Sequence, residues 1–193
     1  ATTVIYTLSL HDALPICRSK IMDRLDVVRQ YVQIGTVGAE IGVWKGDFSK
    51  DLIRVLRPSH LFLIDTWKIN VSPAYRSSWY GATVLDSHFR TVMSRYKSNT
   101  HVTVYRGTFS AFAGSSQTSH LDWVYIDGDH TYSGCLNDLT VAGKMNVQTI
   151  ICDDYEEGGW WGRGVIDAVS AFLDSNPYSK IQYGRQVVLK HVP

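Results

Sequence analysis

The stretch TVGAEIGVWKGDFS, residues 36–49, carries the pattern that decides the fold. Its first half, TVGAEIG, is a short apolar run that ends in glycine, which is typical of a buried strand. A helical pattern follows from Lys45 to Leu56, and Pro58 ends it. A glycine-rich turn therefore joins a buried strand to a helix, which is the repeating unit of an α/β sheet.

The same alternation continues on both sides of this stretch. We predict further strands at 60–65, 101–106, 121–126 and 147–152, and further helices at 18–34, 82–97, 131–145 and 164–173. Two last strands within 180–192 have almost no chain between them, so they must pair as an antiparallel hairpin. The sequence thus predicts an α/β protein with a Rossmann-like, doubly wound, mostly parallel seven-stranded sheet and an antiparallel C-terminal hairpin strand.

The composition is that of one globular domain. The chain has 193 residues, of which 45% are hydrophobic, and its 19 basic and 18 acidic side chains leave a net charge of +1. This balance argues against a nucleic-acid partner, and no run approaches the roughly 18 apolar residues that a membrane span needs. The three cysteines, Cys17, Cys135 and Cys152, are far apart, which indicates a reducing, cytoplasmic setting rather than a disulfide framework or a zinc site.

The first residues form a separate segment. The run TLSLHDALPI at 7–16 resembles the translation of a DNA-sequencing adapter. A signal peptide is excluded because there is no basic start and His11 and Asp12 interrupt the apolar stretch. We therefore expect residues 1–16 to be a non-native leader. A genuine N-terminal extension is the alternative, and deletion of this segment distinguishes the two.

The turn at Gly42 and Gly46 has the features of a ligand site. Glycines let the backbone turn sharply and approach a ligand, and the helix that follows offers free N–H groups to an anion or a carboxylate. Asp65 ends the second strand, where folds of this kind place an acid that binds a ribose. The GxxxG spacing differs from the GxGxxG of dinucleotide-binding turns. An ordinary strand-to-helix turn is the alternative.

Four segments together resemble class I S-adenosylmethionine-dependent methyltransferases, namely AEIGVWKGDFS at 39–49, LID at 63–65, YIDGDHTY at 125–132 and ICDDY at 151–155. The resemblance implies that residues 17–193 form a single domain of this kind. It also implies that the cofactor S-adenosylmethionine is bound by Glu40, Gly42, Gly46, Ser49, Asp65, Gly107, Thr108 and Phe109. Within this set, Glu40 is implied to hold the methionine portion, Ser49 the carboxylate, and residues 107–109 the adenine.

Acidic residues follow the fourth and fifth predicted strands. Asp127 comes after the strand at 121–126, and the pair Asp153–Asp154 follows the strand at 147–152. Because these strands should be neighbours, their carboxylates would crowd one rim of the sheet and repel one another. A bound cation removes this repulsion, and oxygen ligands suit a hard ion such as Mg²⁺, Mn²⁺ or Ca²⁺.

This arrangement resembles the metal-dependent small-molecule O-methyltransferases, including those that act on macrolide sugars. The resemblance implies that Asp127, Asp153 and Asp154 bind the metal. It further implies catalytic roles for Asp127 and for His130, the latter as the general base, which suits an imidazole with an ordinary pKa of about 6.5. Three alternatives stay open. Asp127 interacts only with the cofactor and binds no metal, the Asp153–Asp154 pair caps a helix or loop, or His130 is a structural histidine.

We therefore expect an S-adenosylmethionine-dependent O-methyltransferase that acts on a hydroxyl of a small molecule, a sugar or a phenol, with a divalent metal such as Mg²⁺. A metal-free methyltransferase, a nicotinamide-dependent oxidoreductase and a non-catalytic cofactor-binding module are the alternatives. Aromatic residues on the predicted loops form either a lid over the acceptor or a subunit interface of a homo-oligomer. These residues are Trp67, Trp79, Tyr80, Trp160 and Trp161.

Overall fold

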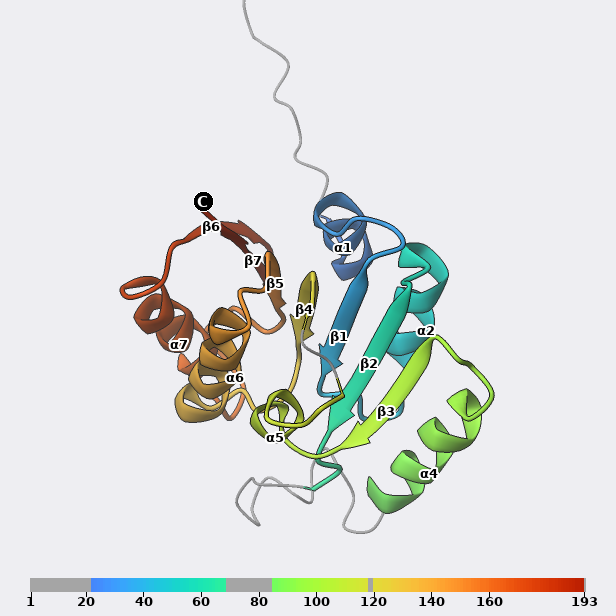
Figure 1. Cartoon of the computed structure of the whole chain (residues 1–193). Coiled ribbons are helices and arrows are strands. Elements are labelled where there is room, and N and C mark those ends of the chain that lie inside the picture. Colours follow the sequence, from blue (N-terminus) through green and yellow to red (C-terminus); the bar gives the residue numbers. More distant parts are fainter. Residues whose placement is uncertain (1–21, 69–84, 118–119, 193) are drawn as a thin grey trace, which may run out of the picture.

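Seven strands form one sheet in the order β3-β2-β1-β4-β5-β7-β6 in the computed structural model, which describes residues 22–68, 85–117 and 120–192 (Figure 1). The strands are β1 (Val37–Ile41), β2 (His60–Asp65), β3 (Val102–Arg106), β4 (Trp123–Ile126), β5 (Thr149–Cys152), β6 (Tyr178–Tyr183) and β7 (Gln186–His191). The helices are α1 (Arg24–Tyr31), α2 (Asp47–Leu56), α4 (Leu85–Tyr96), α5 (Phe109–Ala113), α6 (Tyr132–Lys144) and α7 (Gly164–Leu173). The expected leader, Cys17, Trp79 and Tyr80 lie outside the described residues.

The strand directions confirm the predicted sheet. Strands β1 to β5 pair in parallel, whereas β7 runs antiparallel to both β5 and β6. The parallel register is level across the centre of the sheet. Ile41 at the end of β1 pairs with Ile64 and Ile126, and Ile126 pairs with Cys152. The residues that follow these four positions therefore meet at one edge, where open α/β sheets bind their ligands.

Two hydrophobic cores flank the sheet. Residues of α5, α6 and α7 pack against one face, and residues of α1, α2 and α4 pack against the other (Figure 1). Successive side chains of a strand point to opposite faces. Because both faces of the central strands are covered by helices, their sequences are mostly apolar, with Glu40 of β1 as a buried exception. Gly38 in β1 makes room for the ring of Trp123 in β4, since a Cβ at Gly38 would lie 2.0 Å from that ring.

The structure differs from the sequence prediction in a few boundaries. The short helix α5 was not predicted; it begins where the Thr108 side chain accepts a hydrogen bond from the backbone N–H of Ala111. Strand β6 begins two residues before the predicted start, at Tyr178, and β5 begins at Thr149 rather than at residue 147. Across the described residues, no helix is long and apolar enough to cross a membrane.

Candidate active site

The glycine turn after β1 packs directly against the end of β4. Gly42 has a φ of +90°, and a Cβ on it would lie 2.0 Å from the carbonyl oxygen of Asp127. Gly46 has a φ of +70° and immediately precedes α2. Both positions therefore need glycine for their backbone conformation, and Gly42 also needs it for space. This turn is more constrained than an ordinary connection between a strand and a helix.

The carboxylate of Asp65 holds the turn in place. Its Oδ2 accepts hydrogen bonds from the backbone N–H groups of Val43 at 2.9 Å and Trp44 at 2.8 Å. Its Oδ1 accepts another from the N–H of Trp67 at 2.6 Å. A carboxylate that accepts three backbone bonds fixes the shape of the loop around it. Asp65 is thus a structural anchor of the turn as well as part of the pocket that the turn borders.

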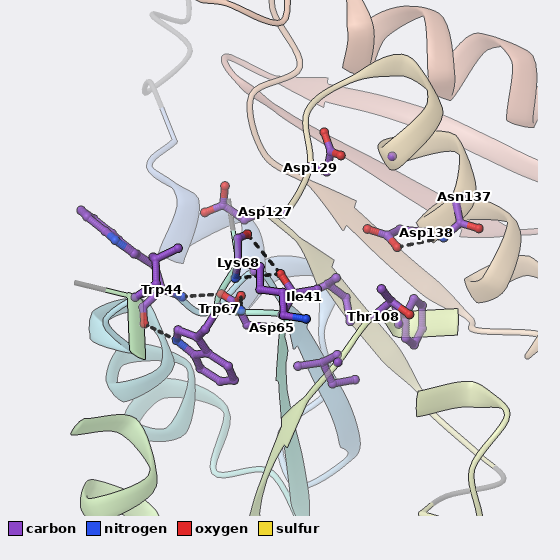
Figure 2. A pocket seen from close by; sticks show the side chains of 18 of the residues that line it. Ile41, Trp44, Asp65, Trp67, Lys68, Thr108, Asp127, Asp129, Asn137 and Asp138 are labelled. Atoms are coloured by element: carbon purple, nitrogen blue, oxygen red, sulfur yellow. Dashed lines mark hydrogen bonds between the residues drawn. The ribbon is translucent and has the colours of Figure 1, made fainter. Parts of the chain in front are cut away.

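A pocket of about 410 Å³ opens at this edge of the sheet (Figure 2). Six of the predicted cofactor-binding, catalytic and metal-binding residues line it, namely Gly42, Asp65, Gly107, Thr108, Phe109 and Asp127. Three expected cofactor residues, Glu40, Gly46 and Ser49, are not among the lining residues. The residues at the predicted strand ends therefore line one pocket. The other three expected cofactor residues do not contribute to its lining.

Glu40 lies on the opposite side of β1 from its neighbours Ala39 and Ile41, toward α2. It is 2% exposed, and the hydroxyl of Ser49, which is fully buried, donates a hydrogen bond to its carboxylate. Burial raises the pKa of Glu40 to about 8. The roles expected for Glu40 and Ser49 in holding the cofactor stay predictions, because in this structure the two side chains are bonded to each other.

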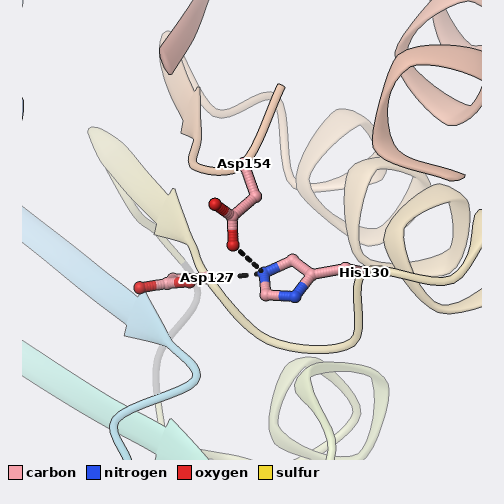
Figure 3. Close-up of side chains that lie close together, drawn as sticks. All are labelled: Asp127, His130 and Asp154. Carbon is pink, nitrogen blue, oxygen red and sulfur yellow. Dashed lines mark hydrogen bonds and ion pairs between the residues drawn. The ribbon is translucent and has the colours of Figure 1, made fainter. Parts of the chain in front are cut away.

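A second group of side chains lies next to the pocket, where Asp127, His130 and Asp154 point toward one another (Figure 3). Nε2 of His130 lies 3.3 Å from Oδ1 of Asp127 and 3.3 Å from Oδ2 of Asp154. One ligand atom of each residue lies within 4.8 Å of the others, a spacing compatible with a shared metal ion. Asp154 has a φ of +54°, an uncommon conformation for a residue other than glycine. Burial raises the pKa of Asp127.

Two arginines balance the charge of these carboxylates. Nη1 of Arg24 lies 3.6 Å from Asp127 and 3.4 Å from Asp153, and its guanidinium stacks over the Phe48 ring at 4.0 Å. Arg185 donates from Nη2 to Asp154. Arg24 and Arg185 also line a cavity of about 330 Å³ together with the three aspartates. The site is therefore a mixed cluster of acids and bases rather than a purely acidic rim.

Asp153 has a different environment from its neighbour Asp154. It is 7% exposed, accepts a hydrogen bond from the Tyr125 hydroxyl at 3.0 Å and another from Nε2 of Gln186 at 2.7 Å. The structure thus brings Asp127 and Asp154 together with His130, and it does not bring Asp153 into that group. The expected role of Asp153 as a third metal ligand stays a prediction.

Aromatic side chains surround His130. The rings of Trp160 and Trp161 lie 6.2 Å and 5.3 Å from its imidazole, and Trp160 also lines the 410 Å³ pocket. Helix α7 begins at Gly164, where a Cβ would lie 2.3 Å from the carbonyl oxygen of His130. Trp67, in contrast, is buried, and its indole N–H donates to the carbonyl of Trp44 at 2.9 Å. Of the expected lid residues that the structure describes, Trp160 and Trp161 lie beside His130, and Trp67 lines the 410 Å³ pocket together with Trp160.

Comparison with known protein families identifies the chain. A family model described as a methyltransferase domain matches residues 39–155, which is more than half of the 193 residues. This chain belongs to that methyltransferase family. The match covers the glycine turn, Asp65, and the whole of the Asp127–His130–Asp154 group.

Solved structures share the fold of this methyltransferase. The O-methyltransferase NovP is 20% identical, with a TM-score of 0.60, over 88% of this chain and 80% of that one. A candidate caffeoyl-CoA O-methyltransferase from Staphylococcus aureus is 15% identical, with a TM-score of 0.61, over 89% and 85%. TrmK from M. capricolum, in complex with S-adenosylhomocysteine, is 12% identical, with a TM-score of 0.57, over 89% and 69%. No curated protein matches the sequence. At these identities the likeness shows the fold alone.

The structure adds residues to the methyltransferase pocket that the sequence analysis missed. Trp44 lines it from the glycine turn, and Asn137 and Asp138 line it from α6 (Figure 2). A signal for Asp138 was present in the sequence. It shares the buried face of α6 with Cys135 and Leu139, so a carboxyl group interrupts an otherwise apolar helix face. Such an interruption is typical of a polar group with a specific role.

The raised pKa of Glu40 predicts a pH-dependent contribution to the stability of the methyltransferase. The folded chain keeps Glu40 protonated up to about pH 8, whereas the unfolded chain ionises it near its ordinary pKa of 4.5. The unfolded state therefore binds fewer protons between these values, and the free energy of unfolding falls as the pH rises from about 5 to 8. Urea unfolding should show a smaller fall in Glu40→Gln than in the wild type. The exposed Glu157→Gln is the control, and an equal fall in all three chains contradicts the prediction.

Proposed function

We propose that this methyltransferase transfers a methyl group from S-adenosylmethionine to a hydroxyl group of a small molecule. One observation carries the proposal. Asp127 lines the 410 Å³ pocket and also belongs to the group with His130 and Asp154. A ligand in the pocket would therefore lie beside groups that can accept a proton, which is the arrangement that methylation of a hydroxyl requires.

The pocket suits S-adenosylmethionine in its chemistry. Ile41, Ile64 and Phe109 supply apolar surface for a planar base, while Asp65 and Asp127 supply negative charge for a cationic ligand with polar groups. TrmK, which shares the fold, is known in complex with S-adenosylhomocysteine. These features support the proposed cofactor.

The proposed reaction is an in-line displacement. The acceptor oxygen attacks the methyl carbon of the sulfonium as the carbon–sulfur bond breaks, and S-adenosylhomocysteine leaves with the bonding electron pair. The hydroxyl proton passes to the imidazole of His130. The carboxylates of Asp127 and Asp154, each 3.3 Å from Nε2 of that ring, stabilise the imidazolium that results. Positioning of the acceptor against the methyl group supplies most of the rate enhancement.

We further propose that Asp127 and Asp154 hold a hard divalent cation such as Mg²⁺. The two carboxylates suit such a cation because hard cations prefer oxygen ligands. One carboxylate oxygen of each residue lies within 4.8 Å of the other. Such a cation, when bound, lowers the pKa of a hydroxyl that coordinates it. In this proposal Asp153 keeps the hydrogen bonds that it accepts from Tyr125 and Gln186, and it does not bind the cation.

A metal-free methyltransferase is the second candidate, and one observation favours it. Arg24 and Arg185 already pair with the carboxylates of the cluster, so part of their negative charge is balanced by the chain itself. In that case His130 and Asp127 alone would accept the proton of the acceptor hydroxyl. Metal removal separates the two candidates.

The test is methyl transfer from labelled S-adenosylmethionine to a panel of phenols, sugars and a tRNA transcript. We expect transfer to a small hydroxylated compound in Mg²⁺ and its loss after exhaustive EDTA treatment. Full transfer after EDTA supports the metal-free candidate. Transfer to the tRNA alone contradicts a small-molecule acceptor, and calorimetry that shows NAD binding without S-adenosylmethionine binding contradicts the proposed reaction class.

The role of Asp65 gives a prediction for cofactor binding. Replacing it by alanine removes the acceptor of three backbone N–H groups, so the glycine turn that borders the pocket loses its anchor. We expect the affinity for S-adenosylhomocysteine to fall by about tenfold or more, as is typical for hydrogen bonds to a charged group. Calorimetry measures this, with the exposed Asp51→Ala on α2 as the control. An affinity equal to that of the wild type contradicts the prediction.

A further inference from the structure

The cavity of about 330 Å³ beside the acidic group has no part in the proposed reaction so far. Polar side chains alone line it, namely Arg24, Asp127, Asp153, Asp154, Arg185 and Gln186. Asp153, Asp154 and Gln186 are at most 9% exposed, whereas the side chains of Arg24 and Arg185 are 42% and 56% exposed. A cavity with a buried polar lining and two accessible cations suits a small charged molecule, because polar groups that leave water need partners.

The two arginines lie close to the proposed base. Oδ1 of Asp127 lies 3.3 Å from Nε2 of His130, and Oδ2 of the same carboxylate lies 3.6 Å from Nη1 of Arg24. Oδ2 of Asp154 lies 3.3 Å from Nε2 of His130, and its Oδ1 accepts a hydrogen bond from Nη2 of Arg185. A single carboxylate therefore separates each guanidinium from the imidazole. A small molecule can contact an arginine and still hold a hydroxyl at His130.

Both guanidinium groups keep N–H donors that no described residue uses. Arg24 contacts two aspartates through Nη1, and its Nε and Nη2 donate to none of the described residues. Arg185 pairs with Asp154 through Nη2 and with Glu156 through Nε, which leaves its Nη1 without an acceptor among the described residues. The ring of Phe48 lies against the Arg24 guanidinium at 4.0 Å and supports its position. A held guanidinium with open donors matches the two oxygens of a carboxylate.

The charge around the cavity favours an anion in the proposed function. Three carboxylates and two guanidiniums line the cavity, and a divalent cation at Asp127 and Asp154 adds two positive charges. One positive charge then remains, which a carboxylate on the acceptor neutralises. A neutral acceptor of the same shape leaves this charge without a partner, and a desolvated charge without a partner is unfavourable.

We propose that the methyl acceptor carries a carboxylate, which Arg24 and Arg185 bind in this cavity while the acceptor hydroxyl lies beside His130. The inference rests on the proposed function and narrows its acceptor to a hydroxylated carboxylic acid. Asp127 lines both the cavity and the 410 Å³ pocket, so a molecule that reaches from one to the other passes the proton-accepting group. The arginines thus position the hydroxyl and select against neutral phenols and sugars.

The test compares 3,4-dihydroxybenzoate with 3,4-dihydroxybenzamide, which has nearly the same shape and no charge. Each is titrated by calorimetry into the full chain with S-adenosylhomocysteine and Mg²⁺. We expect the wild type to prefer the benzoate by about 100-fold, since each of two hydrogen-bonded arginines contributes about tenfold. Arg24→Gln and Arg185→Gln should each lower this preference about tenfold, with the affinity for the amide little changed. Arg185→Lys keeps the charge, should show an intermediate preference, and serves if the glutamine variants do not fold.

Arg163→Gln is the matched control. Arg163 is 52% exposed and pairs with Glu157 and Asp167, but it does not line the cavity. It should keep the wild-type preference for the benzoate, which separates binding by the two arginines from a general effect of removing a positive charge.

Three results overturn the inference. They are equal wild-type affinity for the two probes, binding of neither probe, and equal losses for both probes in the Arg24 and Arg185 variants, which would show a structural role alone. The proposed function survives each of them if the chain binds S-adenosylhomocysteine and methylates a neutral hydroxylated compound. A chain that does neither overturns the proposed function, and the inference with it.

Discussion

Replacing Asp154 by asparagine is expected to lower the rate of methyl transfer by about 100-fold or more, the usual effect of losing acid–base assistance. The affinity for S-adenosylhomocysteine should stay within about threefold, because Asp154 does not line the 410 Å³ pocket. Asparagine is the informative substitute. It tolerates the φ of +54° at this position and keeps the shape of the side chain, so it removes the charge without disturbing the backbone.

The control for this prediction is Glu156→Gln. Glu156 is the other acidic partner of Arg185, at 2.9 Å, but it does not belong to the group with His130. If loss of an ion pair to Arg185 explained the effect, both variants would lose activity alike. Binding of Mn²⁺, followed by electron paramagnetic resonance, gives a second readout and should weaken in Asp154→Asn alone. Turnover and Mn²⁺ binding at wild-type levels would refute the role of Asp154.

The fold was predictable because the signals that determine it are local. The apolar runs at β1, β2, β4 and β5 identify buried strands, and the short connection near Gly184 requires a hairpin. The level register then brings the residues after these strands to one edge, as expected from their place at the strand ends. Helix α5 escaped prediction because it is five residues long, too short for a periodic pattern.

The roles of the individual acids were less predictable. All of them were expected to face a ligand from the rim, but Glu40 points into the sheet–helix interface and bonds to Ser49. Asp65 faces the pocket and is engaged by the backbone of the turn. The direction of each carboxyl group depends on the local backbone dihedral angles and on the register of its strand. The sequence pattern around a single acidic residue does not reveal either of them.

The pair Asp153–Asp154 shows this limit most clearly. The two residues are chemically identical and adjacent, yet Asp153 bonds to Tyr125 and Asp154 lies beside His130. The backbone at Asp154 is left-handed, with a φ of +54°. Neither residue is a glycine or an asparagine, so the sequence carries no sign of this conformation. A cation site at this rim stays a prediction, and only the coordinates show which of these side chains lie close enough together to share an ion.

Replacing Gly42 by alanine is the second large effect that we expect, and it acts through the backbone. A Cβ at this position would lie 2.0 Å from the carbonyl oxygen of Asp127 and 2.7 Å from the Cα of Gly128. Both are backbone atoms of the segment that carries Asp127 toward His130, so the segment itself must move. Left-handed strain of about 1–2 kcal/mol adds to an overpacking cost of about 1–3 kcal/mol. The free energy of unfolding in urea should fall by the sum, and methyl transfer should be lost.

Gly35→Ala separates the two contributions to that loss. Gly35 also has a left-handed φ, +81°, but a Cβ there would meet nothing within 4 Å. It should therefore lose only the strain of about 1–2 kcal/mol, with methyl transfer retained, because Gly35 precedes β1 and so lies at the other end of that strand from the glycine turn. The excess loss in Gly42→Ala then measures the close approach of the turn to β4. Equal losses in the two variants would show that this approach is not what requires glycine at position 42.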